Sequence, residues 1–213
     1  GIDLGSRSVK LTVMSDEKKI IFNKVFETVN FYREYGQKTP EGLVVDFSAL
    51  NIDKADTLVA TGYGRNTLDI VGAIVIPELK AHVLGAIYQT GLKDFTLLDL
   101  GGQDSKVIKV EQGKMVDFDT NDKCAASTGR YLENMANVLN ISLDEMSNYS
   151  ENPVELSSTC AIFGESELIG RIVEGYSVEE LSAGVNYTIF KRIKPMLIGL
   201  KSDKIIFTGG VAI

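Results

Sequence analysis

Several residue types are scarce in this sequence, and each scarcity narrows what the protein can be. Of its 213 residues only two are cysteines, four are prolines and one is a histidine, and tryptophan is absent. Two cysteines do not build the disulfide framework of a small secreted domain, so we expect a cytoplasmic location. No apolar run approaches the roughly 18 residues of a membrane-spanning helix, so we expect no membrane partner.

Basic residues are outnumbered as well. Lysine and arginine total 22 against 29 aspartates and glutamates, which gives a formal net charge of −7. A nucleic-acid-binding surface usually shows a basic excess, so nucleic acid is not an expected partner. The phosphate-binding pattern G-x-x-x-x-G-K-[ST] is also missing, so a nucleotide has to be bound in another way.

What the sequence does contain is an internal repeat. Residues 3–14, DLGSRSVKLTVM, align without gaps with residues 99–110, DLGGQDSKVIKV. The alignment pairs Asp3 with Asp99, Leu4 with Leu100, Gly5 with Gly101, Lys10 with Lys106 and, further on, Phe22 with Phe118. Each copy has the pattern of a buried strand, a glycine turn, an alternating strand, a charged turn and a third strand. Two related copies predict two stacked subdomains that face each other across a cleft.

An aspartate followed by a glycine turn has a physical use. The backbone N–H groups of the turn can approach phosphate oxygens closely because glycine has no side chain. The carboxylates of Asp3 and Asp99 can hold Mg²⁺ directly or through its water shell. Two ordinary hairpins remain the alternative interpretation, which the duplication makes less attractive.

A third glycine motif ends the chain. In KIIFTGGVA a short apolar strand runs into Gly209 and Gly210, where a flat adenine or ribose can lie against the backbone. Two Asp-Gly turns and a distal Gly-Gly resemble the layout of the actin, hexokinase and heat-shock ATPase superfamily. That resemblance implies an α/β fold with two ribonuclease-H-like subdomains, 1–94 and 95–213, each with a mixed sheet and flanking helices around a nucleotide cleft. Because the chain starts with Gly directly in one motif and stops directly after another, we expect both ends to be trimmed or absent here.

Apolar residues at helical spacing predict helices between these motifs. Pro77 suits a first helical turn, and Ser177 and Glu180 have the spacing of a capping box. We expect Pro195 to kink or end the last helix. The apolar stripes are interpreted as packing faces, and they comprise Leu79, Val83, Ala86 and Ile87, then Tyr131, Leu132, Met135, Val138 and Leu139, then Leu168, Ile169, Ile172 and Val173, and finally Leu181, Val185, Ile189 and Ile193. Glu78 and His82 are expected to form a structural or interface pair rather than a metal site.

The two cysteines precede two of these helices. Cys124 stands before the helix that starts near Gly129, and Cys160 stands before the next. The partial positive charge of a helix N-terminus favours a thiolate, the form that binds metal. Two unrelated buried thiols or a disulfide remain open. Two thiolates are too few for a [4Fe–4S] cluster, whereas a two-fold symmetric dimer would supply four.

The segments around the cysteines carry a more specific resemblance. NDKCAASTGRYLENMA and SSTCAIFGESELIG are similar to the two cysteine motifs of the 2-hydroxyacyl-CoA dehydratase activators, whose wider family includes the ATPase subunits of benzoyl-CoA reductase. ATGYGR, DLGGQD, PELKAH and TGGVA match the same family in the same order. The chain departs from the family at Ser127, where glycine is usual, at Ala81, where cysteine is frequent, and over residues 31–54. The family's usual strand and helix after GGVA are missing.

The resemblance implies a homodimer with one [4Fe–4S] cluster between the subunits, held by Cys124 and Cys160 of each chain. It implies ATP or ADP with Mg²⁺ in each cleft, with Asp3 and Asp99 on the metal side and with Gln103 and Asp104 positioning the attacking water. The expected nucleotide-binding residues are Gly5, Ser6, Lys10, Gly101, Gly102 and Gly129, with Gly209 and Gly210 at the adenosine.

The activity implied is ATP hydrolysis coupled to one-electron transfer. ATP would shift the subdomains and the cysteine-bearing helices, and the cluster would then reduce a 2-hydroxyacyl-CoA dehydratase or a related reductase. A ferredoxin or flavodoxin would supply the electron, in an anaerobic cytoplasm. The alternatives are the ATPase subunit of a benzoyl-CoA reductase-like complex, a small-molecule kinase of the same superfamily, which would hold no iron, and a non-catalytic or filament-forming module, which would turn over slowly and polymerise.

Overall fold

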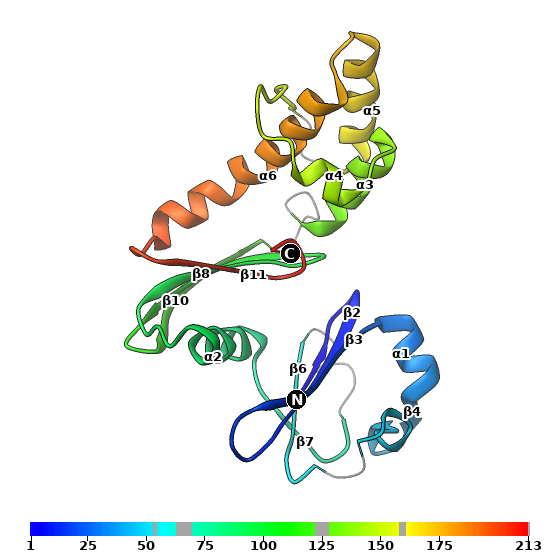
Figure 1. Cartoon of the computed structure of the whole chain (residues 1–213), viewed down its shortest axis with the longest axis vertical. Coiled ribbons are helices and arrows are strands. Elements are labelled where there is room, and N and C mark those ends of the chain that lie inside the picture. Colours follow the sequence, from blue (N-terminus) through cyan, green and yellow to red (C-terminus); the bar gives the residue numbers. More distant parts are fainter. Residues whose placement is uncertain (53–54, 63–69, 122–127, 158–160, 213) are drawn as a thin grey trace. The chain divides into compact units, whose positions relative to one another are not determined.

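The chain is an α/β protein whose strands fall into two compact units. The structure, a computed structural model, describes residues 1–52, 55–62, 70–121, 128–157 and 161–212. Unit 1 covers Gly1–Gly85 and unit 2 covers Ala86–Ile213 (Figure 1). The predicted boundary after residue 94 stays a prediction. In the parts of the chain that the structure describes, no helix combines the length and the apolar character needed to cross a membrane.

Unit 1 is built on a mixed five-stranded sheet in the order β3-β2-β1-β6-β7. The central strand β1 runs antiparallel to β2 and parallel to β6. The strands of this sheet are β1 (Ile2–Leu4), β2 (Ser8–Met14), β3 (Ile20–Glu27), β6 (Leu58–Thr61) and β7 (Ala73–Val75). Between β3 and β6 the chain forms α1 (Thr28–Tyr35), the small hairpin of β4 (Gly36–Thr39) and β5 (Gly42–Val45), and the 3-10 turn η1 (Ser48–Leu50). Helix α2 (Glu78–Thr90) begins in this unit and ends in the next.

The core of unit 1 lies between its sheet and α1. The sheet contributes the buried residues Leu4, Val9 and Leu11, and α1 contributes Phe31, which is fully buried in the same cluster. The ring of Phe26 lies 5.3 Å from that of Phe31, a distance at which aromatic pairs attract. Apolar packing therefore holds helix α1 against strands β1 and β2.

Unit 2 repeats the plan with more helix. Its four-stranded sheet has the order β10-β9-β8-β11, with β8 antiparallel to β9 and parallel to β11. The elements are β8 (Phe95–Leu100), β9 (Ser105–Glu111), β10 (Lys114–Asn121), α3 (Gly129–Leu139), α4 (Leu143–Ser147), α5 (Ala161–Val173), α6 (Val178–Leu200) and β11 (Ile205–Thr208). The long helix α6 runs along one face of this sheet and on to the group of α3, α4 and α5 (Figure 1).

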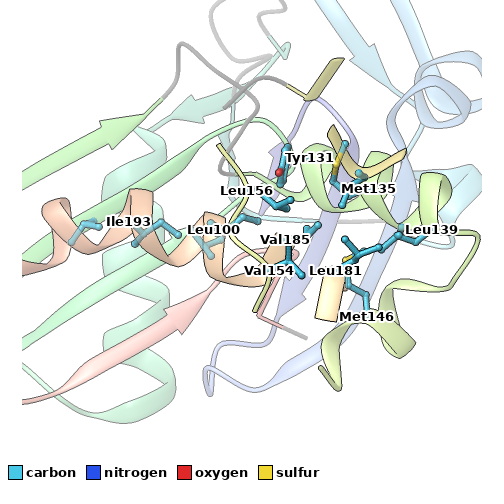
Figure 2. Close-up of a cluster of buried hydrophobic side chains, with 14 of the residues drawn as sticks. Leu100, Tyr131, Met135, Leu139, Met146, Val154, Leu156, Leu181, Val185 and Ile193 are labelled. Carbon is cyan, nitrogen blue, oxygen red and sulfur yellow. The ribbon is translucent and has the colours of Figure 1, made fainter. Parts of the chain in front are cut away.

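The core of unit 2 joins the sheet to α3 and α6. Leu100 and Val107 from the strands meet Tyr131 and Met135 of α3 and Val185 of α6, all at most 4% exposed (Figure 2). The stripes predicted for α3 and α6 are confirmed as packing faces. This core fixes the beginning of α3 beside the turn between β8 and β9.

The predicted repeat is confirmed in the first hairpin of each unit. β1 and β2 pair Asp3 with Lys10, and β8 and β9 pair Asp99 with Lys106, in the same register. The third strands differ. Phe22 lies opposite Val13, but Phe118 lies opposite Ile108, which is one position out of the aligned register. Pairing Phe22 with Phe118 was therefore wrong, and Phe118 is 48% exposed whereas Phe22 packs against its core.

Two helix predictions also need correction. Of the four α5 residues predicted to pack, Leu168 is buried, while Ile169, Ile172 and Val173 are 43–82% exposed. Three of the four residues predicted to pack thus form an open apolar face within this chain. Of the two outcomes predicted for Pro195, the end of the helix is wrong, because α6 continues to Leu200 with Pro195 inside it, and buried residues along α6 hold the helix although Pro195 lacks a backbone donor. The kink stays a prediction.

Candidate functional site

The first predicted phosphate turn connects β1 to β2. Asp3 lies in the middle of β1, and its Oδ2 accepts a hydrogen bond from Lys10 Nζ at 2.9 Å. The Asp3 side chain is 21% exposed and that of Lys10 is 49% exposed, so the pair is open to solvent. A Cβ atom on Gly5 would lie 2.5 Å from the carbonyl oxygen of Ser8, so only glycine fits at the start of this turn. Ser6 and Arg7 at the tip are exposed.

The second turn, between β8 and β9, is built the same way but is more deeply enclosed. Lys106 Nζ lies 2.7 Å from Asp104 Oδ2 and 3.6 Å from Asp99 Oδ2, and its side chain is only 7% exposed. Asp99 is 2% exposed and also accepts a hydrogen bond from Thr208 Oγ1 at 3.0 Å. Gly101 N–H donates to the Asp104 carbonyl at 2.9 Å and closes the turn. A buried carboxylate with these partners is held in one orientation.

Each aspartate also faces a Thr-Gly step on a parallel strand. Thr61 of β6 lies opposite Asp3, and Thr208 of β11 lies opposite Asp99. Both following glycines have positive φ angles, +97° at Gly62 and +95° at Gly209. A Cβ on either would strike the backbone of the preceding motif, at 2.7 Å from Leu4 for Gly62 and 2.6 Å from Leu100 for Gly209. These glycines let two parallel strand ends approach each aspartate closely.

Sequence reasoning assigned Gly209 a role but missed Gly62. The signal was present, because a Thr-Gly dipeptide directly after a short apolar strand occurs at 61–62, in LVATG, and again at 208–209, in IIFTG. The hydroxyl groups of Thr61 and Thr208 make different hydrogen bonds, however. Thr208 Oγ1 bonds to Asp99, whereas Thr61 Oγ1 donates to the carbonyl of Ile76 at 3.0 Å.

Two further predicted residues, Gly129 and Gly210, lie near the second turn. Gly129, the first residue of α3, donates its N–H to the Gly101 carbonyl at 2.9 Å, and Arg130 N–H donates to the Gly102 carbonyl at 3.1 Å. Gly210 is exposed, with open space where a Cβ would stand. Val211, next to it, donates its N–H to the Leu100 carbonyl at 3.3 Å. The end of the TGGVA motif thus lies against the same strand end as the second turn.

The residues predicted to position water are not equivalent. Gln103 is exposed at the tip of the second turn. Asp104 is already paired with Lys106 at 2.7 Å, with 31% of its side chain exposed. Gln103 is therefore the more available of the two for a bound molecule.

The predicted cluster ligands Cys124 and Cys160 both lie outside the described residues. Within the described residues, no group of three or more His, Cys, Asp and Glu side chains could hold a metal ion. Helix α5 begins at Ala161, the residue after Cys160, and α3 begins five residues after Cys124. Glu78 Oε1 and His82 Nε2, the pair on α2, are 3.8 Å apart.

Known proteins match this chain over its whole length. The model of the BadF/BadG/BcrA/BcrD ATPase family matches residues 1–213. The (R)-2-hydroxyglutaryl-CoA dehydratase activating ATPase of Acidaminococcus fermentans is 36% identical over 217 residues, covering all of this chain and 82% of the relative. The activator of lactoyl-CoA dehydratase from Anaerotignum propionicum is 36% identical over 221 residues, with the same coverage of both chains.

A solved structure resembles the fold closely. The activator of the 2-hydroxyisocaproyl-CoA dehydratase from Clostridium difficile with bound ADPNP has a TM-score of 0.81 and 29% sequence identity. The match covers all of this chain and 80% of the other. The fold is therefore that of the actin-like ATPases, as the sequence predicted.

Proposed function

The chain belongs to the BadF/BadG/BcrA/BcrD ATPase family, and on that premise we propose that it is an ATP-dependent activator of a 2-hydroxyacyl-CoA dehydratase-type enzyme. It hydrolyses ATP and couples the hydrolysis to the transfer of one electron to its partner. The observation that carries this proposal is the duplicated turn, with an Asp–Lys pair beside a glycine turn in the same register in both units. The activators among its relatives, similar along the whole chain, supply the partner class.

The two turns would bind phosphate with different groups. The Lys10 side chain is half exposed and pairs with the partly exposed Asp3, so it can turn to a phosphate oxygen without leaving a buried charge behind. Lys106 is enclosed between two carboxylates and serves to hold the second turn in shape. We assign phosphate binding to Lys10 and to the backbone N–H groups of Ser6, Gly102 and Gln103.

Asp3 and Asp99 are the carboxylates proposed to act on the metal side. Mg²⁺ prefers oxygen ligands and keeps several of its waters, which suits a partly exposed carboxylate such as Asp3. Asp99 is almost fully buried and bonded to Thr208, so it would act through water or by its field. When bound, Mg²⁺ neutralises charge on the phosphate oxygens during transfer. The exposed side chain of Gln103 is the group proposed to orient the attacking water.

Cys124 and Cys160 are the residues proposed to hold a [4Fe–4S] cluster. The chemistry of the donor set fits a shared site, because one chain brings two thiols and such a cluster takes four. The exposed side chains of Ile169, Ile172 and Val173, near the C-terminal end of α5, support contact with a second copy of the chain along this helix, since large exposed apolar patches mark protein interfaces. When bound, the cluster supplies a low-potential one-electron donor, which a reduced ferredoxin or flavodoxin would recharge.

The ATPase part of the proposal is tested by Asp3→Asn. Removing the negative charge is expected to lower the rate of ATP hydrolysis on the order of 100-fold, as loss of a key electrostatic group does. Asp16→Asn, at an exposed position in the turn between β2 and β3, is the matched control and should retain the rate. Equal rates for the two variants would contradict the assignment of Asp3.

The electron-transfer part is tested by iron and sulfide analysis of anaerobically purified protein. We expect about four irons per two chains and their loss in both Cys124→Ser and Cys160→Ser, with the rate of ATP hydrolysis as the check on folding. A dimer that stays free of iron after anaerobic reconstitution would contradict electron transfer and leave ATP hydrolysis to be explained otherwise.

A further inference from the structure

Thr28, the first residue of α1, is bonded to both sides of the first turn. Its Oγ1 donates to the Gly5 carbonyl at 2.8 Å, and its backbone N–H donates to the Arg7 carbonyl at 3.2 Å. Thr28 is half-buried, and Phe31 in the same helix is fully buried in the core of unit 1. The turn is thus tied to an element that packing holds in place.

These two bonds determine which way the amide groups of the turn point. In a trans peptide the C=O and the N–H of one plane point in opposite directions. A Gly5 carbonyl held toward α1 therefore directs the Ser6 N–H away from α1. The bond to Arg7 does the same for the Ser8 N–H. Orienting the donors before a ligand arrives removes an ordering cost from binding.

In unit 2 a helix also holds carbonyl groups of the glycine turn, but with backbone amides instead of a side-chain hydroxyl. There the first two amides of α3 donate to the Gly101 and Gly102 carbonyls, which directs the Gly102 and Gln103 N–H groups away from α3. In both units the helix that follows the hairpin holds the carbonyl side of the glycine turn. In unit 1 one of these bonds comes from a side chain, so there the contact can be removed by substitution without touching the backbone.

We propose that Thr28 is a positioning residue for nucleotide binding, which holds the first turn so that the Ser6 amide faces the phosphates. This inference rests on the proposed function, because the turn is taken to bind ATP. Thr28 does not touch the nucleotide itself. It acts through the peptide planes of Gly5 and Arg7.

Tyr32, one helical turn after Thr28, supports this placement of α1. The pKa of its phenol is raised, first by burial and then by the negative charge of Asp3. The same helix therefore brings Thr28 to the turn and Tyr32 into the field of Asp3. Residues four apart lie on one face of a helix, so this face of α1 is directed at the site.

The test compares Thr28→Val, Thr28→Ser and Thr12→Val. Valine keeps the shape of threonine and removes the hydroxyl, and serine restores it. Thr12 lies on β2, where its Oγ1 donates to Asn23 Oδ1 of β3 at 3.1 Å, so its variant loses a side-chain hydrogen bond of the same sheet away from the turn. We expect Thr28→Val to raise the KM for ATP and the Kd for ADP by on the order of fivefold, with kcat nearly unchanged, because ground-state binding is weakened.

Wild-type values for Thr28→Ser and Thr12→Val would complete the expected pattern. A Thr28→Val enzyme with the KM of Thr12→Val would overturn the inference while leaving the proposed function intact. A wild-type protein that neither binds nor hydrolyses ATP would instead overturn the proposed function.

A second measurement covers the case in which Thr28→Val does not fold. Hydrogen exchange of the wild-type protein is followed with and without ADP. ADP should slow exchange in residues 5–8 and at the Thr28 amide together, and leave the turn at 15–19 unchanged. Protection of residues 5–8 without any change at Thr28 would overturn the inference.

Discussion

Gly209 and Gly210 are adjacent glycines with opposite demands on space. Gly209 has a φ of +95°, and a Cβ there would lie 2.6 Å from the backbone of Leu100, whereas a Cβ on Gly210 meets nothing within 4 Å. Gly209→Ala is expected to lower the free energy of unfolding by about 3 kcal/mol, because a strained backbone and a backbone clash are combined. Gly210→Ala is the matched control and should change it by less than about 0.5 kcal/mol. Urea unfolding of both variants measures the difference, and equal midpoints would contradict the close approach at Gly209.

Tyr131 carries a buried hydroxyl that finds no hydrogen-bond partner among the residues that the structure describes. The ring itself is fully buried in the core of unit 2 (Figure 2). An unpaired buried polar group costs about 1–3 kcal/mol, so Tyr131→Phe is expected to leave the protein as stable as before or to stabilise it by about 1 kcal/mol. A thermal unfolding midpoint several degrees lower in the variant would show that the hydroxyl does have a stabilising partner.

Helix α6 depends on a capping box at its start. Ser177 Oγ accepts from Glu180 N–H at 3.2 Å, and Glu180 Oε2 accepts from Ser177 N–H at 2.9 Å. Ser177→Ala is expected to cost about 1 kcal/mol of unfolding free energy. Ser142 caps α4 with a similar bond, from Glu145 N–H at 3.0 Å, but α4 has only five residues. Ser142→Ala should therefore cost less, and the reverse order in urea unfolding would contradict this account.

The elements were predictable where a short sequence pattern determines them. The gap-free alignment of Asp3 with Asp99 and of Lys10 with Lys106 gave the register of the first hairpins, because a tight turn ties the pairing to the spacing. The same alignment could not predict the register of the third strands, β3 and β10. The pairing of β9 with β10 shifts between Met115 and Asp117, and one residue of shift turns a strand's side chains to the other face.

Amphipathic spacing also predicts a face without saying what covers it. The stripe on α6 is buried within the chain, but the stripe on α5 leaves Ile169, Ile172 and Val173 exposed. The two patterns look alike in sequence because both repeat every three to four residues. Only the tertiary arrangement separates a core face from a face left open.

The aspartates and glycines of the candidate site could be predicted from the sequence. The residues that hold its turns in place could not. Asp3, Gly5 and Gly101 follow from motif spacing alone. Gly62 could have been found from the repeated Thr-Gly step, since a duplicated unit repeats its contacts. The hydrogen bonds of Thr28 to Gly5 and Arg7 could not, because they join residues more than 20 positions apart through the packing of α1.

At the scale of the whole molecule, each unit has its own core. The buried cluster of unit 1 is drawn from β1, β2, α1 and β5, and that of unit 2 from β8, β9, α3 and α6. A unit with its own core carries its own stability, which is the usual condition for relative movement of domains. Each of the two duplicated turns therefore belongs to a unit with a hydrophobic core of its own.

Alkaline pH acts on unit 1 through the half-buried Tyr32 and on unit 2 through the buried Tyr131. Burial raises the pKa of Tyr32 in unit 1, with a further rise from the charge of Asp3. Burial likewise raises the pKa of Tyr131 in unit 2, against a lowering by Arg192 and with a further rise from Glu167. An unfolded tyrosine loses its proton near pH 10, whereas these phenols keep theirs to higher pH in the folded protein.

Above about pH 10 the unfolded chain therefore binds fewer protons than the folded one, so the free energy of unfolding falls as the pH rises. The net charge of −7 also grows more negative in this range, but salt screens that repulsion and leaves buried groups largely unaffected. Urea unfolding between about pH 8 and pH 11 at high salt should therefore still show the decline, with a shallower slope in Tyr131→Phe than in the wild type. Parallel slopes would mean that Tyr131 ionises as easily in the folded core as in the unfolded chain, and the decline would then have to come from other groups.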